Sequence, residues 1–498
     1  MARGLHHKHA AMKALSLLGT SSSAGKTWMT TAYCAWLARQ GLRVAPFKAQ
    51  NMSNNALVTP DGGEIARAQA MQAEAAGMTP CAEMNPILLK PSGALGSQLV
   101  MMGRAQGHCP PAEYYRRFDE LWSMVRDTLD GWRNRCDALV IEGAGSPVEL
   151  NLMARDLVNL RPIEHLDGAW ILVGDIDRGG IYAQLTGTWA LLPEAMRRRS
   201  LGCIINRFRG DLSLFPDPQQ WLAPHAPGLR VLGTVPYAGD LRPDEEDGID
   251  PFDLDRGQGD EIAWIRLPHT AILNDCQPWW EDRGVRTRWV SRAADLGTAK
   301  AIVIPGTKNT IADMRWLWST GLGDAIKAAA ARGVPVAGIC GGFQILGRNL
   351  TDPAGVAGDS GEVPGLGLLP VATHFSEPKI VCQRQSRSGD RTWGTYEIHM
   401  GRTTLAAGGV PVPANHLVGL DGRLTGEGLR LGHIWGTYQH GIFDVPETRR
   451  AFALEAGIRG YVAQHVPWMD RRREVYQGMA DLLEAHVDMG PVRRHFGI

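Results

Sequence analysis

Apolar positions in the N-terminal half form short uninterrupted runs, and each run ends in a glycine-rich or acidic turn. The runs are "ALSLLG", "ALVIEG", "WILVGD", "LGCIINRF" and "LRVLGTVPY". Helix-like stretches lie between such runs, for example at residues 27–40 and 64–76. Apolar strands that alternate with helices are typical of a parallel sheet covered on both faces. We therefore predict an α/β domain over residues 13–238.

The pattern breaks at residues 237–261, which are acidic, carry Pro and Gly, and lack apolar periodicity. These properties indicate a connection between domains, and we predict a linker over residues 239–260. Strand-like runs resume with "EIAWIRLP", "AIVIPGTKNT" and "GVPVAGICGG". A second α/β domain is therefore predicted over residues 261–446.

The last segment, residues 447–498, contains an amphipathic pattern. Apolar side chains recur there at helical spacing: Val475, Met479, Leu482 and Leu483. A membrane-surface helix would carry a basic polar face, whereas this polar face mixes both charges. We therefore predict a helical extension that packs on the second domain.

Composition narrows the class of protein. The 498 residues exceed what one core can use, and 52 basic residues balance 52 acidic ones. Because the net charge is zero, we expect neither wholesale nucleic-acid binding nor attraction to a membrane. The apolar stretches are too short to span a bilayer, and the N-terminus lacks the apolar core of a signal peptide. Eight cysteines without CxxC pairs indicate a reducing cytoplasm rather than disulfides or structural zinc.

The segment "GTSSSAGKT" follows the first predicted strand and opens the first predicted helix. In that context a glycine-rich loop binds phosphate, and we predict an ATP site. Gly19, Thr20 and Gly25 would supply backbone N–H groups, Lys26 a charge for the phosphates, and Thr27 a hydroxyl for Mg²⁺. The spacing is one residue longer than in the usual loop. The alternative is a Gly-Ser turn with an exposed lysine.

Acidic residues follow two more of the predicted strands. Glu142 ends "LVIE" and Asp175 ends "LVGD", so both lie where open α/β sheets bind ligands. We predict them as Mg²⁺ ligands, with Glu142 preferred; each could instead cap the next helix. Lys48, in "PFKAQNMSNN", is predicted to meet a phosphate or a substrate carboxylate. The alternative for Lys48 is a solvated loop.

Cys340 lies between the short apolar run "VPVAGI" and the helix-like "FQILGRNL". A strand, a nucleophile, a tight glycine turn and a helix in that order form a nucleophile elbow, which exposes the thiol at the top of the sheet. The helix start would stabilise a thiolate, and the N–H of Gly341 would face a developing oxyanion. The alternative is a buried core cysteine, which is our interpretation of the other cysteines.

A nucleophilic cysteine needs a base, and His440 in "WGTYQHGIFD" follows a strand-like run about one hundred residues downstream. His433 and His399 compete for this role. Gly306 ends an earlier strand of the same predicted sheet, in "IPGTKNT", and its N–H is predicted as the second oxyanion donor.

The cysteine and histidine segments, "GICGGFQILG" and "WGTYQHGIFD", resemble those of class I glutamine amidotransferases. The whole chain, from about residue 15 to 445, resembles the cobyric acid synthase family of the cobalamin pathway. The segments that carry this resemblance are "GTSSSAGKT", "PFKAQNMS", "EIARAQAMQAEAA", "MNPILLKP", "VIEGAGSPVELNL", "GDIDRGGIYAQLTGT", "INRFRGD", "IPGTKNTIADM" and "YEIHMGRT". The resemblance implies a dethiobiotin-synthetase-like P-loop domain joined to a flavodoxin-like glutaminase domain.

The resemblance also implies an activity: ATP- and Mg²⁺-dependent amidation of the b, d, e and g carboxylates of adenosylcobyrinic acid a,c-diamide. Ammonia would come from L-glutamine, with Cys340 as nucleophile and His440 as base. Many class I enzymes carry a glutamate two residues after the histidine. That position is Ile442 here, so the residue that orients His440 is not identified.

Three alternatives stay open. A cobyrinic acid a,c-diamide synthase would use the same chemistry on other carboxylates. A partitioning-type P-loop ATPase switch would need neither Cys340 nor glutamine. A γ-glutamyl cysteine hydrolase would leave the P-loop half without a role. Assembly into a homo-oligomer is also left open by the sequence.

Overall fold

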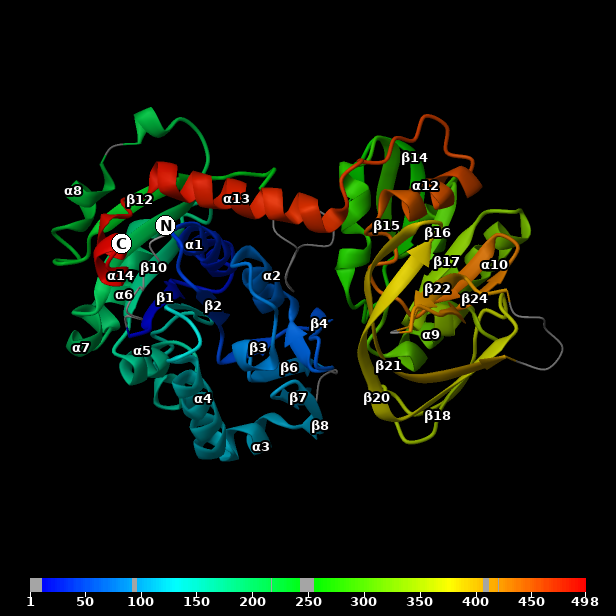
Figure 1. Cartoon of the computed structure of the whole chain (residues 1–498), viewed down its shortest axis with the longest axis horizontal. Helices are drawn as coiled ribbons and strands as arrows, with labels where there is room; N and C mark the ends of the chain where they lie inside the picture. Colours follow the sequence, from blue (N-terminus) through cyan, green and yellow to red (C-terminus); the bar gives the residue numbers. More distant parts are fainter. Residues whose placement is uncertain (1–10, 92–95, 216, 242–254, 406–411, 420) are drawn as a thin grey trace, which may run out of the picture.

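The computed structural model describes residues 11–91, 96–215, 217–241, 255–405, 412–419 and 421–498. Two bodies lie side by side, and one long helix starts at the edge of the second body and runs along the first (Figure 1). The predicted linker falls largely on residues 242–254, which lie outside the described residues.

The first domain is built on a fully parallel six-stranded sheet of order β12-β11-β10-β1-β9-β2. Its strands are β1 (Lys13–Gly19), β2 (Val44–Phe47), β9 (Ala138–Glu142), β10 (Ala169–Asp175), β11 (Ser200–Phe208) and β12 (Val231–Pro236). The central strands β1, β9 and β10 are buried almost throughout, which is why they read as unbroken apolar runs. The helices of this domain are α1 (Lys26–Arg39), α2 (Arg67–Ala75), α3 (Pro111–Arg116), α4 (Phe118–Trp132), α5 (Leu160–Leu166), α6 (Ile181–Leu191), α7 (Glu194–Arg197) and α8 (Pro218–Leu222).

A smaller part of the first domain faces the second one. It consists of a four-stranded sheet and a two-stranded hairpin. The strands are β3 (Gln50–Met52), β6 (Ile87–Pro91), β7 (Ser97–Met101) and β8 (Arg104–Cys109), with β4 (Ala56–Val58) and β5 (Glu64–Ala66) in the hairpin. The helix expected from residue 64 therefore begins only at Arg67, because Glu64–Ala66 pair with β4.

The second domain is also α/β, as predicted. Its seven-stranded sheet has the order β13-β15-β14-β16-β17-β25-β24, with antiparallel strands at both edges. The strands are β13 (Arg256–Gly257), β14 (Gly259–Ile265), β15 (Gly284–Val290), β16 (Ala301–Ile304), β17 (Val336–Ile339), β24 (Leu429–Leu431) and β25 (Ile434–Thr437). Its helices are α9 (Thr310–Ser319), α10 (Leu322–Ala331), α11 (Gly341–Leu346) and α12 (Pro446–Glu455).

A second sheet, of six strands, covers one side of the second domain and was not anticipated. Two long antiparallel strands dominate it, and shorter strands extend it. They are β20 (Val371–Ser388) and β21 (Arg391–Leu405), with β18 (Asn349–Asp352), β19 (Gly361–Pro364), β22 (Asn415–Val418) and β23 (Leu424–Glu427). Figure 1 shows β20 and β21 on the side that faces the first domain.

The prediction for the C-terminal extension needs correction. The helix α12 and the residues that follow it pack on the second domain, through Phe452 and Ala453. The long helix α13 (Trp468–His486) and α14 (Gly490–Phe496) pack on the first domain instead, where Met479 and Leu483 join the core formed with α1. The amphipathic pattern shows which face of a helix is buried, but not which partner covers it.

Candidate active sites

The loop between β1 and α1 curls around the side chain of Lys26. Gly25 has φ +97°, and a Cβ there would lie 2.0 Å from Nδ2 of Asn206, so this position requires glycine. A Cβ at Gly19 would lie 2.7 Å from Nζ of Lys26. Nζ of Lys26 donates to the carbonyls of Ser21 at 2.9 Å and Gly145 at 3.0 Å. The lysine is therefore buried within the loop and is not the exposed side chain of a simple turn.

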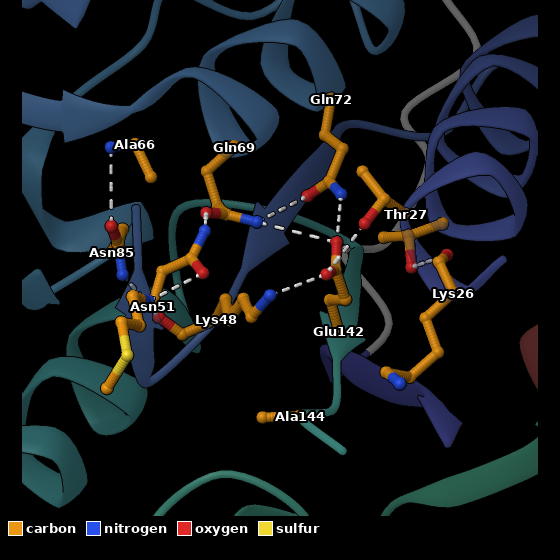
Figure 2. A network of polar contacts seen from close by, with 12 residues as sticks. Lys26, Thr27, Lys48, Asn51, Ala66, Gln69, Gln72, Asn85, Glu142 and Ala144 are labelled. Carbon is orange, nitrogen blue, oxygen red and sulfur yellow. Dashed lines mark hydrogen bonds and ion pairs between the residues drawn. The ribbon is translucent and has the colours of Figure 1, made fainter. Parts of the chain in front are cut away.

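Glu142 lies at the centre of a buried network beside this loop (Figure 2). Its Oε1 accepts from Thr27 Oγ1 at 3.0 Å and from Lys48 Nζ at 2.6 Å. Gln72 and Gln69 of α2 donate to its Oε2. Glu142 and Lys48 are both almost inaccessible, which rules out a solvated loop for Lys48. The structure thus brings together Thr27, Lys48 and Glu142, three of the residues singled out from the sequence.

Other predicted residues lie nearby. Thr20 donates its N–H to Val173 and its hydroxyl to Gln184 Oε1, at 3.0 and 2.9 Å. Asp175 is buried at the end of β10, but its Oδ2 pairs with Arg207 at 3.0 Å. Each carboxylate has a cationic partner, Arg207 for Asp175 and Lys48 for Glu142, but Glu142 also contacts the hydroxyl of Thr27. Glu142 is therefore the better placed acid.

Oxygen donors suit Mg²⁺, which usually takes one or two protein ligands besides phosphate oxygens and water. Thr27 and Glu142 offer a hydroxyl and a carboxylate 3.0 Å apart beside the phosphate loop. Among the described residues there is no cluster of three or more His, Cys, Asp or Glu that could hold a metal alone. The donor set therefore fits a metal that is shared with a nucleotide.

Cys340 stands at a strained turn between β17 and α11, with φ +54° and ψ −108°. A Cβ on Gly342 would lie 1.9 Å from the carbonyl oxygen of Ile304, and one on Gly341 would lie 2.6 Å from Thr307 Cγ2. No larger residue fits at either position. The strand, the turn and the helix follow in the order expected of a nucleophile elbow.

His440 is fully buried, and its Nδ1 contacts Oδ2 of Asp275 at 2.8 Å. The other oxygen of Asp275 accepts the N–H of Gly441, also at 2.8 Å, which fixes the carboxylate. Within the described part of the chain, Nε2 of His440 has no hydrogen-bond partner. This nitrogen belongs to the cavity that Cys340 also lines. Cysteine, histidine and aspartate therefore form a triad arrangement.

The charge of His440 follows from its neighbours. Burial disfavours the imidazolium, but the interactions with Asp275 and Cys340 outweigh burial and raise the pKa of His440 to about 10. A protonated histidine beside a thiolate is the ion pair that nucleophilic cysteines use.

Asp275 is the functional residue that sequence reasoning missed. It lies 165 positions before His440, in "LPHTAILNDCQPWW", and no spacing rule connects the two. The only signal was the missing glutamate at Ile442, which implied that an acid must come from elsewhere.

The rival histidines are placed less well. His433 precedes β25 at the strand end remote from Cys340, and its Nε2 contacts the carbonyl of Ala330 at 2.9 Å. His399 lines the same cavity as Cys340, but its ring stacks on Tyr438 and its Nδ1 contacts the carbonyl of Gly401. Gly306 lies against the pair, since a Cβ there would be 3.2 Å from His440 Cε1 and 3.8 Å from Cys340 Cβ.

The cavity around Cys340 reaches the first domain, because Asn54 and Lys90 also line it. The domain boundary there is packed. A small buried cluster joins Val58 and Leu88 of the first domain to Ile272 and Ile398 of the second.

Comparisons with known proteins agree with this division. The family model described as "CobQ/CobB/MinD/ParA nucleotide binding domain" matches residues 15–252, and the "CobB/CobQ-like glutamine amidotransferase domain" matches residues 261–448. A cobyric acid synthase from Roseiflexus castenholzii is 44% identical over 475 residues, which is 91% of this chain and 92% of the relative. The chain belongs to the cobyric acid synthase family.

Relatives named cobyric acid synthase in other bacteria match nearly end to end. The one from Nostoc punctiforme is 40% identical and covers 96% of this chain and 99% of its own. The one from Variovorax paradoxus is 42% identical and covers 96% and 98%. In the order of the two family models, this chain joins a nucleotide-binding domain to a glutamine amidotransferase domain. Among the described residues, no helix is long and apolar enough to cross a membrane.

Proposed function

We propose that this chain amidates the b, d, e and g carboxylates of adenosylcobyrinic acid a,c-diamide, using ATP and L-glutamine. One observation carries the proposal: the Cys340–His440–Asp275 arrangement opens onto residues of the nucleotide-binding domain. A hydrolase would not need the nucleotide-binding domain, and an ATPase switch would not need the cysteine, histidine and aspartate. The eight free cysteines support a place in the cytoplasm.

In the glutaminase domain, the Cys340 thiolate attacks the side-chain amide carbon of glutamine. Backbone N–H groups of Gly306 and Gly341 stabilise the oxyanion, and the imidazolium of His440 gives its proton to the departing nitrogen, which leaves as ammonia. Water then cleaves the thioester, His440 takes the proton of that water, and glutamate leaves. Asp275 keeps the ring of His440 oriented throughout.

In the first domain, a carboxylate oxygen of the corrinoid attacks the γ-phosphorus of ATP, which gives an acyl phosphate and ADP. Lys26 and the loop N–H groups bind the phosphates, and Lys48, which pairs with Glu142 beside the loop, stabilises charge on the transferred group. Thr27 and Glu142 would hold Mg²⁺, which neutralises phosphate charge when bound. Ammonia displaces phosphate from the acyl group and forms the amide.

A cavity of about 340 Å³ beside the phosphate loop is our proposed site for one edge of the corrin ring. Gly145, whose carbonyl holds Lys26, lines this cavity together with the aromatic Tyr114 and Phe118. Large apolar side chains at its rim are unusually exposed: Met52 by 57%, Leu152 by 43% and Tyr115 by 39%. A contiguous exposed apolar surface next to a reactive centre is typical of a ligand site.

The corrin site is tested with Leu152→Asp, which places a charge where the apolar ring would lie. We expect the KM for the corrinoid to rise by about 10-fold or more, since burying an unpaired charge is costly, with no change in glutamine hydrolysis. Leu214→Asp is the matched control, because Leu214 is 81% exposed elsewhere on the same domain. An equal effect of both substitutions would contradict the assignment.

The proposed reaction is tested by mass spectrometry of the corrinoid product, which counts the amides gained. Four are expected from the a,c-diamide with ATP and glutamine. An a,c-diamide synthase would instead add two to cobyrinic acid. Cys340→Ala should abolish glutamine-driven amidation and keep ammonia-driven amidation. In a switch ATPase, the same substitution would leave ATP hydrolysis unchanged and no amidation would be seen.

A further inference from the structure

Four charged side chains meet at the domain boundary beside Cys340. Lys90 of β6 and Glu64 of β5 come from the first domain, and Lys308 and Lys379 come from the second. Lys90 Nζ lies 2.7 Å from Oε2 of Glu64, and Lys379 binds its Oε1. Lys90 and Glu64 are fully buried, and the side chain of Lys379 is only 10% exposed.

Positive charge exceeds negative charge in this cluster. Both oxygens of Glu64 are taken by Lys90 and Lys379. Among the described residues, the third ammonium, Lys308, donates to the neutral Oε1 of Gln98 at 2.6 Å. Burying like charges together costs folding free energy, so a simple interdomain ion pair does not explain three lysines around one carboxylate.

The surplus positive charge lies at the cavity of the proposed glutaminase site. Lys90, Lys308 and Lys379 line the same cavity as Cys340 and His440. A buried surplus of cations is offset by an anionic ligand, and charge-assisted hydrogen bonds to a carboxylate are strong in such surroundings. Glutamine carries a carboxylate on the carbon chain that leads to its reactive amide.

We propose that Lys308 and Lys379, together with Lys90 from the nucleotide-binding domain, hold the α-carboxylate of glutamine. This inference rests on the proposed function and adds one consequence: the glutamine pocket is complete only when both domains contribute. These lysines position the substrate and do not take part in bond breaking.

The test replaces Lys308, Lys379 and Lys90 singly with Met and follows glutamate formation from glutamine. Each substitution should raise the KM for glutamine by about 10-fold or more, the effect of losing a hydrogen bond to a charged group. Ammonia-driven amidation should stay within about twofold, which also shows that the variants fold. Lys327→Met, at an exposed lysine of α10, is the control and should change nothing.

A substrate change separates binding of the carboxylate from a structural role. Glutamine α-amide lacks the negative charge, so the wild type should turn it over with a much higher KM than glutamine. In Lys308→Met the two substrates should differ far less. If the variants lose the same factor on both substrates, or if ammonia-driven amidation falls equally, the lysines do not hold the carboxylate. If the wild type itself releases no glutamate, the proposed function fails rather than this inference.

Discussion

At the residue scale, the proposed glutaminase chemistry of the second domain depends on the contact between Asp275 and His440. The carboxylate makes one 2.8 Å contact with the ring and is itself fixed by the N–H of Gly441. This contact selects the tautomer and stabilises the imidazolium. Asp275 takes the place of the glutamate that the sequence lacks at position 442.

Asp275→Asn should lower glutamine-driven activity by about 10- to 100-fold, the effect of losing a charge-assisted hydrogen bond, and leave ammonia-driven amidation intact. Because the wild-type pKa of His440 is about 10, the alkaline fall of glutaminase activity should move to lower pH in the variant. A pH profile of glutamate release measures both effects. An unchanged alkaline limb would contradict the role of Asp275.

The same pKa has a consequence for stability. A folded pKa of about 10 lies above the ordinary 6.5, so the contribution of protonated His440 is complete below about pH 6.5 and is lost as pH rises towards 10. Denaturant unfolding across this window should show a smaller loss of stability in Asp275→Asn than in the wild type.

At the scale of elements, the turn between β17 and α11 allows no side chain at Gly342. Gly342→Ala would drive a Cβ to 1.9 Å from a backbone oxygen, so we expect a loss of about 3 kcal/mol or more, or failure to fold. Gly187→Ala is the matched control, because Gly187 also lies in a helix without a positive φ and an added Cβ would meet nothing within 4 Å. It should change stability by less than about 1 kcal/mol. Thermal unfolding compares the two, and similar losses would show that the clash is relieved.

The helix α13 belongs to the second domain in sequence but to the first in packing. Leu483→Ala removes a fully buried side chain from the core shared with α1 and should cost about 2–5 kcal/mol. The loss should fall on the nucleotide-binding domain and be relieved by ATP. Leu454→Ala, at a position 78% exposed on α12, should stay within about 0.5 kcal/mol. Domain-resolved hydrogen exchange distinguishes these outcomes, and loss of protection in the second domain alone would contradict the assignment.

At the scale of the whole molecule, a side chain of the first domain holds the segment of the second domain that carries Asp275. Oδ1 of Asn55 accepts the N–H groups of Ile272 at 2.9 Å and Leu273 at 3.4 Å, just before Asp275. The nucleotide-binding domain therefore helps to position the acid that orients His440.

Asn55→Ala should lower glutaminase activity by about 5- to 100-fold, because the N–H groups of Ile272 and Leu273 lose their acceptor, although residue 55 lies outside the glutaminase domain. Ammonia-driven amidation should be retained, which excludes a general folding defect. Kinetics with both nitrogen sources measure the effect. Equal losses with glutamine and ammonia would place the role of Asn55 in the first domain instead.

The sequence by itself determined the features that are encoded locally. The phosphate loop and the cysteine elbow are each encoded by about ten consecutive residues, because a strand, a turn and a helix follow one another along the chain. Local order also predicted two α/β domains, the site residues Lys26, Thr27 and Cys340, and the helix at α1. The sheet of β20 and β21 was not predicted, because the exposed and buried positions of these strands do not form uninterrupted apolar runs.

Only the tertiary structure decided which distant residues meet. Asp275 reaches His440 across 165 positions, Lys90 and Glu64 join Lys379 across the domain boundary, and α13 packs on α1 rather than on its neighbours in sequence. Apolar periodicity predicts that a side chain is buried, and its charge indicates which kind of group it can bind. Neither property identifies the residue that it contacts. That choice depends on how whole domains pack, and it gives the glutaminase site its orienting acid and its buried lysines.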